Sequence, residues 1–79
     1  MSKRQNTISR AIRSKGVYKS KETGQLWIVE KDRRNAANGQ NYVIKHKHPD
    51  RNLHVHAYAL SKESAVKKIL KHEEWTLGK

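Results

Sequence analysis

The sequence predicts a small α+β domain, in which a three-stranded antiparallel sheet packs on one C-terminal helix. Residues 53–60 alternate between apolar and polar side chains, which is typical of a strand that buries only one face. Ser61 follows at once and starts a segment whose apolar residues have helical spacing. Two more strand-like runs precede this pair, and a chain of 79 residues holds one domain at most.

Turn signals separate the three segments that have the composition of strands. The first predicted strand is Gln25–Asp32, and the strong turn signal Asn38–Gly39 lies between it and the second strand. The second predicted strand is Asn41–Lys47. A turn at residues 49–52, which contains the only proline, then leads into the third strand at residues 53–60.

A helix is predicted directly after the third strand. Ser61 is its expected N-cap, because a serine side chain accepts a hydrogen bond from a free amide of the first turn. The helix is expected to end near His72, and Trp75 and Leu77 are expected to fold back and extend the core. The apolar stripe that would face the sheet consists of Ala65, Val66, Ile69 and Leu70.

Residues 1–21 are predicted to form a basic arm outside the globular domain, which would span residues 22–79. The arm carries seven lysine or arginine side chains and no acidic one, so it holds seven of the eleven net positive charges. Residues 6–15 have the pattern of a short helix, with apolar residues on one face and Gly16 at the position of a C-terminal cap.

The register of the second hairpin predicts which side chains share a face. A four-residue turn places His48 opposite Leu53, and therefore Ile44 opposite Ala57, under the helix. A slip by one residue would turn two lysines of the second strand toward the core, which favours this register. The solvent-facing side of the sheet is then expected to carry Lys45, Lys47, His54, His56 and Tyr58. The first strand adds to this side either Trp27, Val29 and Lys31 or Leu26, Ile28 and Glu30.

Composition excludes several classes of function. The chain has no cysteine, so it forms neither a disulfide nor a zinc site with thiolate ligands. It has no apolar run of the ~18 residues that a membrane span needs and no hydrophobic signal region, so a cytoplasmic location is expected. Because no nucleophile–base pair and no glycine-rich phosphate loop occur, we expect neither an enzyme nor a cofactor.

Four histidines flank the predicted turn of the second hairpin, and paired imidazoles are typical metal ligands. In the predicted register His46 and His48 point to one face of the sheet, whereas His54 and His56 point to the other. The sequence therefore predicts no metal site, and only a shifted register would bring the four rings together.

The net charge of +11 favours nucleic acid as the partner, because lysine and arginine displace counterions from phosphates. Cations, hydrogen-bond donors and a stacking ring on one sheet face suit phosphates and bases. In the arm, the expected contacts are Arg10, Arg13, Lys15, Lys19 and Lys21. In the rest of the chain they are Arg33, Arg34, Lys45, Lys47, His54, His56 and Tyr58.

Residues 24–72 resemble the three-stranded-sheet-plus-helix DNA-binding domain of phage-type integrases. The resemblance rests on Trp27 early in the first strand, the turn at Asn38–Gly39, and the Ser-Lys-x-x-Ala helix start at residues 61–65. It implies a sheet face that enters the major groove, and so duplex DNA ahead of RNA. The helix start is also similar to that of double-stranded-RNA-binding domains, although Glu63 stands where that family has a second lysine.

A protein-binding module is the alternative. Tiny, basic, cysteine-free chains are similar to small phage proteins that bind a host factor and inhibit or redirect a nucleic-acid-handling protein. Such a protein would use the same basic face to occupy a nucleic-acid groove on its target or to bind an acidic partner. Salt-dependent binding to nucleic acid would separate the two hypotheses.

Overall fold

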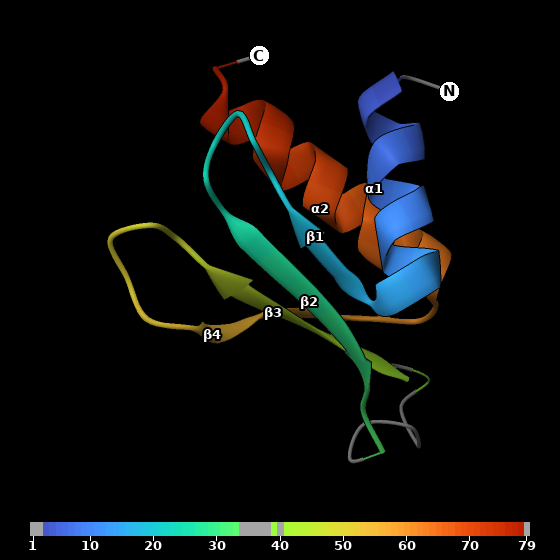
Figure 1. The fold of residues 1–79 in the computed structure, drawn as a ribbon. Coiled ribbons are helices and arrows are strands. Elements are labelled where there is room, and N and C mark those ends of the chain that lie inside the picture. The colour runs from blue at the N-terminus through green and yellow to red at the C-terminus, as the bar shows by residue number, and fades with distance from the viewer. Residues whose placement is uncertain (1–2, 34–38, 40, 79) are drawn as a thin grey trace.

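The computed structural model describes residues 3–33, 39 and 41–78. Its elements are α1 (Lys3–Lys15), β1 (Val17–Lys19), β2 (Leu26–Lys31), β3 (Tyr42–Lys47), β4 (His54–Ala59) and α2 (Lys62–Thr76). The strands form one antiparallel sheet in the order β1-β2-β3-β4. Both helices lie on the same side of this sheet (Figure 1), so the α+β class and the C-terminal helix are as predicted.

The sheet has four strands, and the prediction of three is wrong. The additional strand, β1, pairs Val17 with Ile28 and Lys19 with Leu26. Gly16, in the left-handed conformation at φ 72°, turns the chain from α1 into this strand, and its carbonyl accepts a hydrogen bond from the Val29 amide. A strand of three residues is too short for its alternation of apolar and polar side chains to be recognised in the sequence. Its pairing with β2 is what defines it.

The helix predicted at residues 6–15 is present and begins three residues earlier, at Lys3. Ile8 and Ile12 are fully buried, and α1 packs against α2. Most of the segment predicted as an arm therefore contributes secondary structure and apolar contacts to the fold. The core cluster consists of Ile8, Ile12, Tyr18, Trp27, Val29, Ile44, Ala59, Ala65, Val66 and Ile69.

Helix α2 begins as predicted, because the Ser61 side chain accepts a hydrogen bond from the Ser64 amide. The helix ends at Thr76, four residues beyond the expected end. Trp75 does not extend the core, since 73% of its surface is exposed. The fully buried side chain of this last turn is Glu73, which accepts hydrogen bonds from side chains of β2 and of the turn before it.

The register of β3 and β4 is as predicted in one half and differs in the other. Ile44 pairs with Ala57, but His46 pairs with His54 because a β-bulge interrupts the ladder between these two pairs. The bulge adds one residue to β4, at His56, and so reverses the faces of the residues before it. The predicted placement of His54 and His56 on the solvent-facing side is therefore wrong.

Candidate functional site

One face of the sheet, which we call the open face, is turned away from both helices. Pairing across the four strands places ten side chains on it, in three rows. These are Lys19, Leu26 and Lys47; Val17, Ile28, Lys45 and Val55; and Glu30, Val43 and Tyr58. Strand β2 thus contributes Leu26, Ile28 and Glu30 to the open face, which is the second of the two sets predicted for the first strand.

The middle row of the open face is mostly apolar, and Lys45 is the one cation in it. Val17 and Val55 expose 39% and 49% of their surfaces, and they lie at the two ends of one cross-sheet row. Lys45 in the same row forms an ion pair with Glu30, with Nζ and Oε2 3.1 Å apart. An exposed apolar strip of this kind is typical of a contact surface rather than of a solvated one.

The predicted nucleic-acid contacts do not form one surface. Arg10, Arg13 and Lys15 lie exposed on α1, behind the sheet, and Arg13 pairs with Glu63 of α2. Lys21 and Arg33 are exposed outside the strands, and Arg34 lies outside the described residues. Four predicted contacts share the open face: Lys19, Lys45, Lys47 and Tyr58.

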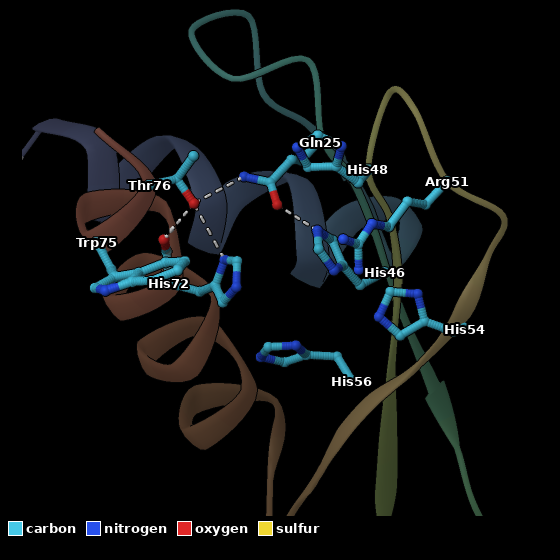
Figure 2. A pocket seen from close by; sticks show the side chains of 9 residues that line it. All are labelled: Gln25, His46, His48, Arg51, His54, His56, His72, Trp75 and Thr76. Atoms are coloured by element: carbon cyan, nitrogen blue, oxygen red, sulfur yellow. Dashed lines mark hydrogen bonds between the residues drawn. The ribbon is translucent and has the colours of Figure 1, made fainter. Parts of the chain in front are cut away.

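A pocket lies on the helix side, between the end of α2 and the β3–β4 hairpin (Figure 2), and it contains the remaining predicted contacts. Its volume is about 340 Å³. The residues that line it are Gln25, His46, His48, Arg51, His54, His56, His72, Trp75 and Thr76. Among these, His46, His54, His56 and His72 form what we call the histidine cluster.

Trp27 forms the base of this cluster. Its indole ring stacks on the ring of His46, with centroids 4.1 Å apart, and meets His56 and His72 edge-on at 5.0 and 5.2 Å. His54 lies edge-on to His46 at 5.2 Å. The bulge in β4 and the length of α2 together bring these rings from three elements to one place.

A network of buried polar side chains contacts His46 of the cluster. Gln25 is fully buried; its Oε1 contacts Nε2 of His46, and its Nε2 donates to Oε2 of Glu73 over 2.8 Å. Thr23 and Trp27 donate to the same carboxylate oxygen, at 2.8 and 3.3 Å. The other oxygen of Glu73, Oε1, is buried without a hydrogen-bond partner in the described part of the chain.

Burial favours the neutral form of His46, His56 and His72. Removal from water is the main cause that lowers the pKa of His46 from 6.5 to about 4, and the neighbouring histidines contribute to the same shift. Burial is also the main cause that lowers the pKa values of His56 and His72. Neutral imidazoles keep a lone pair on one ring nitrogen, so these histidines present hydrogen-bond acceptors and potential metal ligands to a pocket that Arg51 also lines.

Comparisons of this chain with protein-family models, with curated proteins and with solved structures found no match. No helix in residues 3–33 or 41–78 is long and apolar enough to cross a membrane. The site is therefore interpreted from its own geometry.

Sequence reasoning missed the contributions of Gln25, Trp27 and His72 to the pocket. The first two were assigned only to a strand, and His72 was assigned to the end of a helix. The one signal that indicates His72 is its position three residues after the buried Ile69, which keeps it on the sheet side of α2. No local signal indicates the bulge.

Proposed function

We propose that this protein binds nucleic acid, with duplex DNA preferred over RNA, through the open face. The observation that carries the proposal is an uncovered sheet face on which Lys19, Lys45 and Lys47 lie among apolar side chains, with Tyr58 on the same face. His54 and His56 take no part in it, because they lie on the helix side. The exposed cations of both helices add attraction at longer range.

The chemistry of the open face suits a DNA groove. Lysines neutralise phosphates and release their counterions, which supplies affinity without sequence preference. A strand surface fits the major groove of B-DNA, where apolar side chains contact thymine methyl groups and a tyrosine hydroxyl reaches a base edge or a phosphate. We therefore expect strongly salt-dependent binding with modest sequence preference.

The test is a fluorescence-anisotropy titration of labelled duplex DNA, duplex RNA and single strands at about 50 and 200 mM salt. A double variant, Lys19→Ala with Lys47→Ala, removes two cations from the open face. Its matched control, Lys67→Ala with Lys71→Ala, removes the same charge from the exposed side of α2. We expect the first pair to weaken duplex binding more and to reduce the salt slope by about two.

Three results would count against the proposal. Flat titrations for every nucleic acid at low salt would exclude the function. A higher affinity for RNA or for single strands would contradict the preference for duplex DNA. Equal losses in the two double variants would show that net charge, and not the open face, drives binding.

A protein-binding function is the second candidate, and the exposed apolar strip favours it. Val17 and Val55 are exposed, and apolar contact area drives association between proteins. In this case a purified complex with a host nucleic-acid-handling protein would persist at high salt, and Val55→Ser, which removes apolar area without adding a charge, would weaken it strongly. The same variant would change nucleic-acid affinity much less than the loss of two lysines.

A further inference from the structure

The histidine cluster lies on the opposite side of the sheet from the open face and takes no part in the proposed nucleic-acid contacts. It unites His46 from β3, two histidines from β4 and His72 from α2 around one cavity (Figure 2). In the predicted register the two histidine pairs of the hairpin point to opposite faces of the sheet, so they could not bind one metal ion. The bulge removes that obstacle, because it turns His54 and His56 to the side of His46.

The spacing of the rings matches the demand of a metal ion. A tetrahedral ion about 2.0–2.1 Å from each ligating nitrogen separates the centres of its imidazole rings by about 5 Å. The three separations among His46, His56 and His72 are 5.5, 5.1 and 4.8 Å. Of these three rings, His54 contacts that of His46, at 5.2 Å, and so lies at the edge of the cluster.

The hydrogen bonds around the cluster occupy one ring nitrogen on each of three histidines. Nε2 of His46 contacts the carbonyl oxygen of the Gln25 side chain, and Nδ1 of His54 lies 3.3 Å from the backbone carbonyl of Asn52. Nδ1 of His72 lies 3.4 Å from Oγ1 of Thr76, whose hydroxyl donates to the His72 carbonyl. A neutral imidazole that donates from one nitrogen keeps the lone pair of the other for a ligand.

The hydrogen-bond partners of His46 are also those expected around a metal-bound histidine. Metal-bound imidazoles are usually held by a carboxylate or carbonyl acceptor on their second nitrogen. His46 contacts Gln25, and Gln25 donates to Glu73, so a buried carboxylate lies one hydrogen bond behind the ring. Its negative charge complements a cation in the cluster and is otherwise expensive at a fully buried position.

We propose that the histidine cluster binds one late first-row divalent metal ion, Zn²⁺ or a similar ion, through His46, His56 and His72, with His54 at the edge of the site. As they stand, the described histidine, aspartate and glutamate side chains include no group of three arranged to hold a metal ion. Binding therefore turns the rings toward a common centre, which a cavity of about 340 Å³ permits. Imidazole is a ligand suited to Zn²⁺, Ni²⁺ and Cu²⁺.

The first measurement is calorimetric titration of the EDTA-treated, dialysed full chain with ZnCl₂ at pH 7.5. We expect one ion per chain and a rise in the unfolding temperature on binding. His72→Asn and His56→Asn should each weaken the affinity at least tenfold. The comparison variant is His48→Asn, the same change at a histidine that lines the pocket but lies outside the cluster, and it should weaken the affinity much less.

A second readout keeps the proposal testable if a variant does not fold, which circular dichroism would reveal. In wild-type protein, Zn²⁺ should shift the ring-nitrogen NMR signals of His46, His56 and His72 far more than that of His48. Co²⁺ should bind at the same site with the visible absorption of tetrahedral nitrogen coordination. An absence of stoichiometric binding, or binding that His48→Asn weakens as much as His72→Asn does, would overturn the proposal.

Discussion

His46 stacks on Trp27, with ring centroids 4.1 Å apart and planes inclined by 16°. The contact joins the pocket to the core, because the indole is fully buried and its Nε1 donates to Glu73. One residue of β2 therefore supports both the fold and the histidine cluster. Changes at Trp27 and its neighbours consequently give the most direct tests of the structure.

We expect Trp27→Phe to destabilise the protein by about 2–4 kcal/mol. The smaller ring leaves a cavity beneath the histidines and removes one donor from the Glu73 carboxylate. Urea unfolding followed by circular dichroism measures the change. Trp75→Phe is the matched control, and because Trp75 is exposed its effect should stay within about 0.5 kcal/mol. Equal effects of the two variants would contradict the placement of these rings.

We expect the free energy of unfolding to decrease as the pH falls from about 6.5 toward 4 in metal-free buffer. Burial holds the pKa of His46 near 4, below its ordinary value, so the unfolded chain binds more protons than the folded one in this interval. His56 and His72 act in the same direction. The loss from His46 alone is on the order of 2–3 kcal/mol.

Urea unfolding at a series of pH values measures this dependence. His46→Gln should flatten it, because glutamine has no titrating group at that position. His48→Asn should change it less, because His48 is the smallest of the causes that lower the pKa of His46. A stability that stays constant between pH 6.5 and 4 would show that these rings are not kept from protonation by burial.

We expect Glu73→Gln to lower the free energy of unfolding by about 1–3 kcal/mol. Oε2 of Glu73 accepts from Thr23, Gln25 and Trp27, and an amide oxygen accepts more weakly than a carboxylate while its NH₂ group needs acceptors. Thermal unfolding checks the change. Glu74→Gln is the control at the neighbouring position, which is only partly buried, and a larger effect there would refute the assignment of the buried network to Glu73.

We expect Gly16→Ala to cost about 1–3 kcal/mol. Gly16 has a φ of 72°, and an added Cβ would lie 3.0 Å from the Val29 carbonyl oxygen at the junction of α1 and β1. Gly78→Ala carries the same conformational cost at φ 79° but has no atom within 4 Å of its Cβ. Urea unfolding should therefore show a smaller loss for Gly78→Ala, and the reverse order would argue against the close approach.

Periodicity and capping predicted much of the fold. The alternation over residues 53–60 indicated β4, Ser61 indicated the start of α2, and the pairing of Ile44 with Ala57 followed from the turn. The placement of Lys45 and Lys47 on the solvent-facing side also agrees with the structure. These features depend on neighbouring residues or on a short hairpin, so local rules suffice for them.

Local rules of this kind do not predict the histidine cluster. The bulge at His56 leaves no mark in the alternation of β4, yet it moves His54 to the opposite face. His72 lies near the end of α2, where Gln25 donates hydrogen bonds to Glu73 and Thr76. Each of these contacts joins segments that are distant in the sequence.

By itself, the sequence determined an α+β domain with an excess of positive charge, three of its four strands, and a capped C-terminal helix with an apolar stripe. The tertiary structure decided the short strand β1, the bulge in β4 and the meeting of four histidines over Trp27. The physical reason is that periodicity and caps are local properties, whereas strand partners, register shifts and shared pockets are set by packing between remote segments.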